Sequence, residues 1–363
     1  MSRIMKLLAA VLALTMLASA CGDDDGTTAS GDLPTVVVTT NILGDVVTQL
    51  VGGAVEVVTI MPVGADPHDF QASAQQAAAM RTADVLIVNG GSFEEGLLDV
   101  IEGAESDGVN VYEAMSVVST IEFGEGGHDH GGHDDHGGHD DHDDHDDHDD
   151  HDDHDDHDDH DDHEGHDDHD DHDDHDDHSG HDHSGEDPHF FTDPARMAAA
   201  VDGIAAFLIA NVEGIDADTV TEAAEAYHAE LEALDAEVAA LVADIPAENR
   251  VLITNHEVFG YFADRYGFEV AGAIIPSGST LDGTSAGDLA ELAELITDAG
   301  VPAIFSDVSA SDQLAQTLAD EVGGDVQVVE LFTESLGDSD SEGATYINMV
   351  RTNATRIAEA LAS

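Results

Sequence analysis

The sequence predicts an α/β fold in which two βα lobes with parallel sheets are joined by one long rigid helix. Short apolar runs alternate with helical patterns twice, once on each side of a long helical stretch within residues 213–247. Such alternation is typical of βαβ units, whose strands pair in parallel and whose helices cover both faces of the sheet. The 41% hydrophobic content supplies two cores in a chain of 363 residues.

The N-terminal lobe is expected to span residues 34–212. Its strands are predicted from β-branched or continuous apolar runs at 35–40 (TVVVTT), 55–60, 85–89 (VLIVN) and 109–112. Its helices are predicted from helical spacing of apolar residues or from alanine content at 42–51, 72–83, 94–101 and 194–209. Asp193, which directly precedes Pro194, is expected to cap the last of these helices.

The linker helix is predicted over 218–243, where apolar residues recur at helical spacing, and Pro246 ends it. The C-terminal lobe is expected over 248–363. Its strands are predicted at 251–254, 270–275, 301–305 and 326–331, and its helices at 258–266, 286–298, 312–321 and 342–360.

Residues 1–20 are expected to be a signal peptide. Arg3 and Lys6 precede an apolar run at 7–17 that is too short to span a bilayer. The segment L-A-S-A-C at 17–21 resembles a bacterial lipobox, which implies cleavage before Cys21 and a lipid on its thiol. The alternative is ordinary cleavage that leaves a free thiol. Residues 21–33, rich in Gly, Asp, Thr and Ser, are then a flexible lipidated tether.

A D-D-H repeat dominates residues 128–183 and holds 20 of the 24 histidines. Its period of three matches neither helix nor strand, and its like charges repel, so this insertion is expected to be disordered without metal. Imidazole and carboxylate both bind zinc, which favours an auxiliary weak metal tract over an acidic spacer. The net charge of −73 argues against nucleic acid as a partner. The tract includes His128, His130, His133, His136, His181 and His183.

Only four histidines lie outside this tract. His68 and His256 follow the predicted strands at 55–60 and 251–254, and ligands of open α/β sheets bind at the carboxyl ends of strands. Together with His189, in another loop, they predict a shared metal site in the cleft between the lobes, although each one alone would be an ordinary loop histidine. His228 lies among Glu and Ala in the long helix and is expected to be a surface residue.

Four motifs make the prediction specific. They are D-P-H-D-F at 66–70, D-P-H-F-F-T-D-P at 187–194, N-H-E-V-F-G-Y-F at 255–262 and L-F-T-E-S-L-G at 331–337. With them, the mature chain resembles the bacterial zinc/manganese/iron ABC-transporter solute-binding lipoproteins (cluster A-I), of the zinc type with a His-rich loop. The resemblance implies that His68, His189 and His256 are metal ligands. It places Glu334 at the fourth ligand position, where the family usually has Asp.

The resemblance implies an extracytoplasmic protein, not an enzyme, that captures a divalent transition metal and delivers it to an ABC permease. Three imidazoles and one carboxylate suit tetrahedral Zn²⁺. Family members that bind manganese commonly carry Glu where His256 stands, so Mn²⁺ and Fe²⁺ remain alternatives, as does a surface metal buffer or adhesin. Asp66 and Asp187 are candidate partners of the ligand imidazoles. The protein is expected to be a monomer, lipid-anchored on the outer face of the cell membrane, or periplasmic in a Gram-negative source.

Catalysis is the other chemistry that three histidines can support, because they can hold a zinc ion with an open position. The sequence contains no H-E-x-x-H helix and no Ser or Cys nucleophile motif. A fourth protein ligand at Glu334 would close the site, whereas a catalytic site would keep water there.

Overall fold

The computed structural model describes residues 33–123, 185–323 and 326–362. The predicted signal peptide, Cys21 and the tract 128–183 lie outside these residues. The N-terminal lobe holds a parallel four-stranded sheet in the order β2-β1-β3-β4. Its strands are β1 (Thr35–Val38), β2 (Glu56–Thr59), β3 (Val85–Val88) and β4 (Asn110–Glu113).

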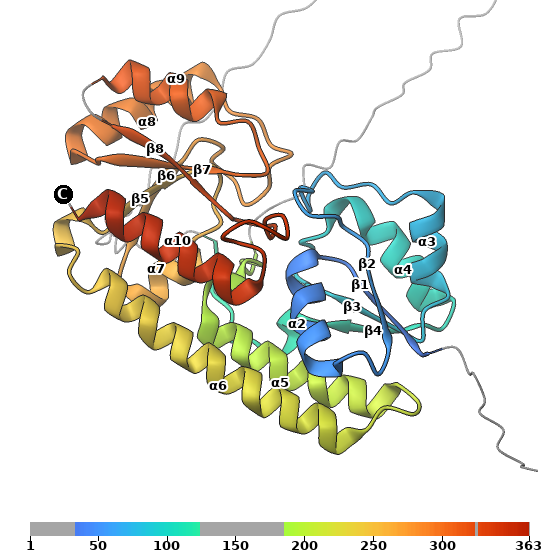
Figure 1. Cartoon of the computed structure of the whole chain (residues 1–363). Coiled ribbons are helices and arrows are strands. Elements are labelled where there is room, and N and C mark those ends of the chain that lie inside the picture. The colour runs from blue at the N-terminus through green and yellow to red at the C-terminus, as the bar shows by residue number, and fades with distance from the viewer. Residues whose placement is uncertain (1–32, 124–184, 324–325, 363) are drawn as a thin grey trace, which may run out of the picture.

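Helices cover both faces of this sheet (Figure 1). Alternate strand residues point to opposite faces, so Val37 packs into the core beneath α3 (Ala74–Arg81) and α4 (Leu98–Ser106). Val36 and Val38 pack into the larger core formed with α2 (Asn41–Val51) and α5 (Pro194–Asn211). Short 3-10 turns lie at Glu95–Leu97, Ala114–Val117 and Phe190–Thr192.

The strands of the C-terminal lobe also pair in parallel. Strand β5 (Val251–Thr254) pairs with β6 (Glu269–Ala273), β7 (Ala303–Asp307) pairs with β8 (Gln327–Leu331), and β5 lies beside β7. Ile253 and Ile304 pack into a core shared with the helices on one face. The helices of this lobe are α7 (Gly260–Tyr266), α8 (Ala286–Ala299), α9 (Gln313–Val322) and α10 (Tyr346–Leu361), with a 3-10 turn at Ala247–Asn249 before β5.

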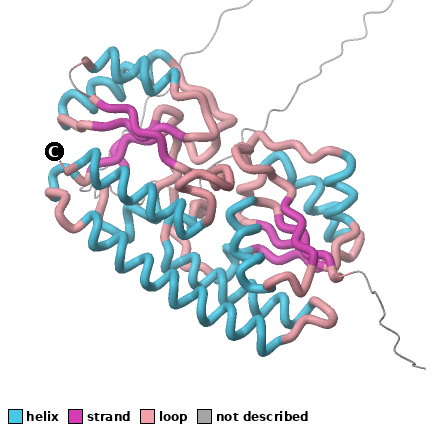
Figure 2. The backbone as a smooth tube through the Cα atoms, viewed as in Figure 1, coloured by secondary structure: helices cyan, strands magenta, loops and turns pink. Residues whose placement is uncertain are grey.

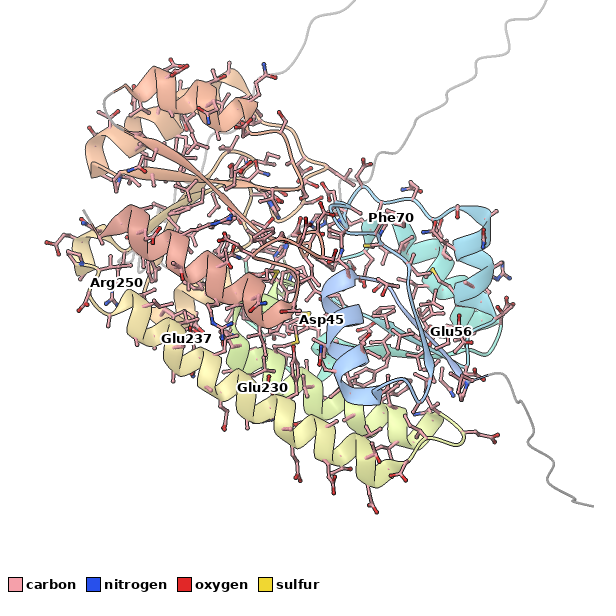
Figure 3. All side chains as sticks on the ribbon, viewed as in Figure 1. Asp45, Glu56, Phe70, Glu230, Glu237 and Arg250 are labelled. Atoms are coloured by element: carbon pink, nitrogen blue, oxygen red, sulfur yellow. The ribbon has the colours of Figure 1, made fainter. Side chains whose placement is uncertain are left out.

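One long helix, α6 (Ala217–Val242), runs beneath both lobes (Figures 1 and 2). It contacts α2 and α5 of the first lobe and α10 of the second. Its buried face includes Leu231, Leu234 and Val238. On α6, the labelled Glu237 accepts a hydrogen bond at 2.8 Å from Arg351 of α10 (Figure 3). Because one continuous helix contacts both lobes, it limits how far they can move apart.

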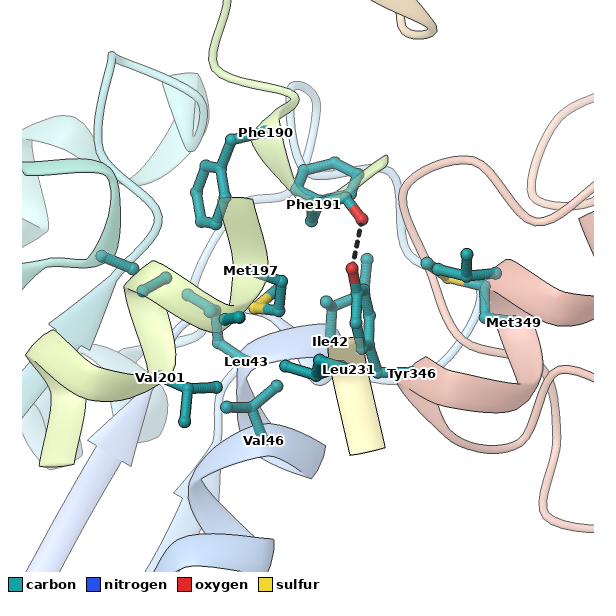
Figure 4. Close-up of a cluster of buried hydrophobic side chains, with 14 of the residues drawn as sticks. Ile42, Leu43, Val46, Phe190, Phe191, Met197, Val201, Leu231, Tyr346 and Met349 are labelled. Carbon is teal, nitrogen blue, oxygen red and sulfur yellow. Dashed lines mark hydrogen bonds between the residues drawn. The ribbon is translucent and has the colours of Figure 1, made fainter. Parts of the chain in front are cut away.

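The hydrophobic core continues from one lobe into the other. Tyr346, fully buried at the start of α10, packs among Leu43, Met197 and Leu231, and its hydroxyl donates to the carbonyl oxygen of Phe191 at 2.8 Å (Figure 4). A shared core of this kind favours small relative motions of the lobes, because close-packed interiors resist deformation.

The observed architecture confirms the predicted α/β fold with two lobes of parallel strands. Several helix starts were predicted too early. The segment at 94–101 begins with a 3-10 turn and becomes α-helical only at Leu98, and α7 begins at Gly260 instead of residue 258. The helices predicted from residues 72 and 342 begin at Ala74 and Tyr346. Asp193 caps α5 as predicted, accepting the amide of Ala195 at 2.8 Å. Within the described residues, no helix is both long and apolar enough to cross a membrane.

Candidate metal centre

His68 lies in the loop that follows β2. The side chain of Asp66 accepts the backbone amide of His68 at 2.9 Å and the hydroxyl of Thr280, from the other lobe, at 2.6 Å. Asp66 therefore fixes the backbone of this loop and links it to the other lobe across the boundary between the lobes, which we call the seam. The ring of His68 contacts a different carboxylate. Nδ1 of that ring lies 2.9 Å from a carboxylate oxygen of Glu95.

His189 directly precedes the 3-10 turn at Phe190–Thr192. Oδ1 of Asp187 accepts its backbone amide at 2.9 Å and lies 2.7 Å from its ring Nδ1. The hydroxyl of Tyr261 donates to the carbonyl of Asp187 at 2.6 Å. A Cβ at Gly260 would lie 2.6 Å from Oδ2 of Asp187, so glycine is needed at the start of α7 to leave room for this carboxylate. Of the two aspartates predicted as partners of ligand rings, Asp187 contacts the ring of His189, whereas Asp66 accepts the backbone amide of His68 and the hydroxyl of Thr280.

His256 follows β5 in a loop whose backbone is held by hydrogen bonds at His256 itself and at the next residue. Its carbonyl accepts the hydroxyl of Thr254 at 2.7 Å, and the amide of Glu257 donates to the carbonyl of Ser277 at 2.9 Å. The side chain of His256 is fully buried. Among the described residues, nothing hydrogen-bonds its Nδ1.

Glu334 follows β8, and its loop is held against the first lobe. Asn41 accepts the amide of Leu336 at 2.7 Å and donates to the hydroxyl of Ser335 at 3.1 Å. The amide of Gly64 also donates to Ser335, at 2.7 Å. These bonds fix the backbone on both sides of the carboxylate, which points into the seam with one oxygen, Oε2, unpartnered among the described residues.

The other oxygen of Glu334, Oε1, lies among three imidazoles. It is 2.8 Å from Nε2 of His68, 3.2 Å from Nε2 of His189 and 3.2 Å from Nε2 of His256. All four side chains are buried, and one ligand atom from each lies within 4.8 Å of the others. Ligands around a tetrahedral zinc ion, at about 2.0–2.1 Å from the metal, are about 3.3 Å apart. Oε1 of Glu334 already lies near this separation from the three nitrogens, and the ligand atoms that are up to 4.8 Å apart would draw closer around a small divalent ion.

Burial and charge act against each other in this cluster. Burial lowers the pKa of His68, but the charge of Glu334 and the hydrogen bonds of Glu334 and Glu95 outweigh it and raise that pKa to about 10. Burial also opposes the shift at His189, whose pKa is raised by Asp187 and Glu334. Burial would raise the pKa of Glu334, but His256 and His68 hold it well below its ordinary value. The ion-free site thus binds protons that a metal must displace.

The loop after β3 also contributes to the site, which was not predicted from the sequence. Phe93 packs edge-on against His68 and His189, with ring centroids 5.2 and 5.5 Å apart. Buried Glu94 accepts the amide of Asn89 at 2.6 Å and the hydroxyl of Thr39 at 2.5 Å, which fixes the loop on the sheet. The signal that could have found this loop is its position, N-G-G-S-F-E-E directly after a buried strand.

A cavity of about 350 Å³ leads to the edge of His68. Its lining includes the carboxylates of Glu95 and Glu186, and it includes Phe123 and Gly185, the described residues that flank 124–184. The amide of Phe123 donates to the carbonyl of Gly185 at 3.2 Å, so the two ends of that segment meet at the cavity. Of the four cluster residues, His68 is the one in the lining of this cavity.

The remaining candidate residues lie apart from the cluster. His228 is partly exposed on α6, where its Nδ1 lies 3.1 Å from Asp202 of α5. Cys21 and the predicted weak metal tract, including His128, His130, His133, His136, His181 and His183, lie outside the described residues.

Comparison with known proteins places this geometry in a family. Curated relatives include the zinc-binding protein TroA of Treponema pallidum, 28% identical over 366 residues and 98% of each chain. They also include the manganese-binding lipoprotein MntA of Bacillus subtilis, 26% identical with 98% of each chain covered. The manganese ABC transporter substrate-binding lipoprotein PsaA of Streptococcus pneumoniae is 24% identical, with 99% of each chain covered.

Solved structures agree on the fold. The periplasmic zinc-binding protein TroA superposes with a TM-score of 0.71 at 27% identity, covering 91% of this chain and 99% of that one. The manganese-bound periplasmic metal-binding protein of Candidatus Liberibacter asiaticus gives a TM-score of 0.66 at 18% identity, covering 90% and 99%. The family described as "zinc-uptake complex component A periplasmic" matches residues 36–360. With its two parallel lobes and its cluster of three histidines and one glutamate, the chain belongs to this family of zinc-uptake components.

Proposed function

We propose that this protein captures one Zn²⁺ between its lobes, outside the cytoplasm, and delivers it to an ABC importer. The observation that carries the proposal is the position of Glu334 Oε1, within 3.2 Å of imidazole nitrogens from three separate chain segments. Buried charged and polar groups are costly unless they are paired or coordinate a metal. A divalent ion held by His68, His189, His256 and Glu334 would give these groups that role.

The donor set favours zinc over the other metals of the family. Three imidazole nitrogens and one carboxylate oxygen make a four-coordinate zinc site, whereas manganese prefers oxygen ligands. The relative TroA is named a zinc-binding protein, while MntA and PsaA are named for manganese. Manganese and iron are therefore the alternative cargoes, and a surface metal buffer or adhesin is the alternative role.

Binding and release, not catalysis, suit this arrangement. A catalytic zinc ion keeps an open position for water or substrate, whereas four protein side chains converge here. Release would require the lobes to shift on docking to the permease. Such a shift would break the seam contacts of Ser335 with Asn41 and Gly64, and of Asp66 with Thr280. Because α6 and the core cross the seam, the motion would be small.

The N-terminal region and the histidine tract complete the proposal. Cys21 would carry a lipid that holds the protein at the outer face of the membrane, as the lipoprotein names of MntA and PsaA suggest. The tract 128–183 would collect zinc weakly through its imidazole and carboxylate groups, both of which bind this ion. Its flanking residues, Phe123 and Gly185, line the cavity beside His68, so collected ions would be released close to the site.

The test is a competition titration with zinc and with manganese on protein lacking residues 128–183. The proposal expects one tightly bound zinc per chain and weaker manganese binding. Import of zinc by cells that carry the cognate permease and ATPase should then require the intact chain. Absence of a tight zinc site would overturn the proposal, and zinc binding without any dependence of import on this protein would favour the metal buffer.

A further inference from the structure

One carboxylate beside the cluster has no assigned role. Oε1 of Glu95 lies 2.9 Å from Nδ1 of His68, on the side of the ring opposite Glu334, whose Oε1 lies 2.8 Å from Nε2. The side chain of Glu95 is 11% exposed and that of His68 is 3% exposed. Both residues line the same cavity. The ring of His68 is therefore held from both of its nitrogens by carboxylates that come from different lobes.

The position of Glu95 is fixed by the fold. Its neighbour Glu94 is fully buried and bonded to the amide of Asn89 and the hydroxyl of Thr39. A side chain at Gly96, the next residue, would overlap the carbonyl of Phe70, so the turn at Glu95–Leu97 packs directly on the His68 loop. Phe93 packs edge-on against the ring of His68. The carboxylate of Glu95 is thus presented to Nδ1 by a rigid loop.

This contact has a chemical consequence for metal binding. An imidazole that offers the Nε2 lone pair to a cation must carry its proton on Nδ1. A carboxylate that accepts a hydrogen bond from this Nδ1–H fixes the ring orientation and raises the basicity of Nε2. Asp187 makes the equivalent contact with Nδ1 of His189, at 2.7 Å. For His256, the described residues supply no partner of Nδ1.

We infer that Glu95 is the positioning residue of His68: it accepts a hydrogen bond from Nδ1–H and aims Nε2 at the bound ion. The inference rests on the proposed function, because it concerns a ligand of that site. The loop after β3 would then help to set zinc affinity through Glu95, in addition to packing Phe93 against the ring of His68.

The test compares Glu95→Ala and Glu95→Gln with Glu186→Gln in the full chain, by zinc titration against a chelator strong enough to keep weak sites empty. Glu186 is the matched control, because its carboxylate lines the same cavity but accepts the hydroxyl of Thr120 at 2.6 Å. Loss of such a partner typically weakens metal binding about 10–100-fold. We expect that loss for Glu95→Ala, partial recovery for Glu95→Gln, whose amide oxygen still accepts, and no change for Glu186→Gln.

A second readout separates positioning from general folding effects. In the zinc-loaded wild type, proton NMR should show the Nδ1 proton of His68 as a downfield resonance protected from exchange, and Glu95→Ala should lose it. Wild-type affinity together with a retained resonance in Glu95→Ala would overturn the inference alone. Equal losses in Glu95→Ala and Glu186→Gln would also overturn it, by showing a general charge effect. Failure of the wild type to bind zinc would overturn the proposed function as well.

Discussion

Oε1 of Glu334 lies 2.8 Å from Nε2 of His68, although 266 positions separate the two residues in the chain. Glu334 follows the last strand of one lobe and His68 follows the second strand of the other. The contact can form only when the two lobes meet, so the proposed metal site and the relative position of the lobes depend on one another. A ligand held between them would bias that position.

The first prediction concerns His189, one of the four proposed ligands. His189→Ala should weaken zinc binding more than about 100-fold, because losing a ligand exceeds the cost of losing an outer partner. The matched control is His228→Ala, which removes a histidine on α6 that contacts Asp202 instead of the cluster. Competition titration of both variants checks this. Unchanged zinc affinity in His189→Ala would remove that residue from the site.

The second prediction concerns the carboxylate. Glu334→Gln keeps the size of the side chain but removes its charge, so zinc affinity should fall at least about tenfold. Glu330→Gln, on the exposed side of β8, is the control. Equal affinity in wild type and Glu334→Gln, measured in the same titration, would show that this carboxylate does not bind the ion.

The third prediction is a rise of zinc affinity with pH. The pKa of His68 is raised to about 10 in the ion-free protein, so between pH 6 and 8 zinc must displace at least the proton of that ring. Log affinity should then rise by about one per pH unit for each proton released. Titrations in buffers of different ionisation enthalpy count these protons, and a flat profile would argue against proton displacement.

The raised pKa of His68 makes the stability of the ion-free protein change with pH in the opposite direction to zinc affinity. Because the folded-state pKa of His68 lies above its unfolded value of about 6.5, its contribution is complete below that pH and disappears as pH rises through about 10. Glu334, with its lowered pKa, contributes above its ordinary value and loses that contribution as pH falls. From pH 6.5 upward, the free energy of unfolding of the ion-free protein, measured with denaturant, should therefore fall. Zinc affinity, measured by titration, should rise over the same range.

The sequence was sufficient to predict the two lobes, but not to predict which residues contact each candidate ligand. Alternation of apolar runs and helical spacing depends on neighbouring residues, and it predicted parallel sheets on both sides of α6. The partners of the histidine rings depend on tertiary packing. Asp66, two residues from His68, is a candidate partner of its ring by sequence, yet it accepts the backbone amide of His68, while Glu95, 27 positions away, reaches Nδ1. Spacing along the chain does not reveal which loop will pack on the ring.

Helix starts show the same limit. The apolar pattern at 258–266 predicts a helix from Val258, but the amide of Val258 donates to the carbonyl of His256 in a tight turn that presents the imidazole. The helix begins only at Gly260, which must be small beside Asp187. The local pattern is therefore overridden where the chain builds the site.

The fourth prediction concerns the seam between the lobes. Tyr346→Phe removes the hydroxyl that donates to the carbonyl of Phe191 and leaves that buried oxygen without its partner. The free energy of unfolding should fall by about 1–3 kcal/mol. Urea unfolding of ion-free protein measures this. An unchanged midpoint would show that another donor reaches the carbonyl.

The fifth prediction concerns the histidine tract. Deletion of residues 128–183 removes 20 of the 24 histidines and should lower the number of zinc ions bound while leaving one tight site. Metal analysis and calorimetry of the shortened chain check both numbers. Loss of the tight site on deletion would show that the tract and the buried cluster do not act separately.

A single zinc ion held by His68, His189, His256 and Glu334 would lie where the two lobes meet. Anomalous diffraction at the zinc absorption edge, from crystals of zinc-loaded protein lacking 128–183, would locate it. We expect one strong peak bounded by the three Nε2 atoms and a Glu334 oxygen, about 2.0–2.1 Å from each. A zinc-loaded crystal with no peak between these four side chains, or with its strongest peak elsewhere, would contradict it.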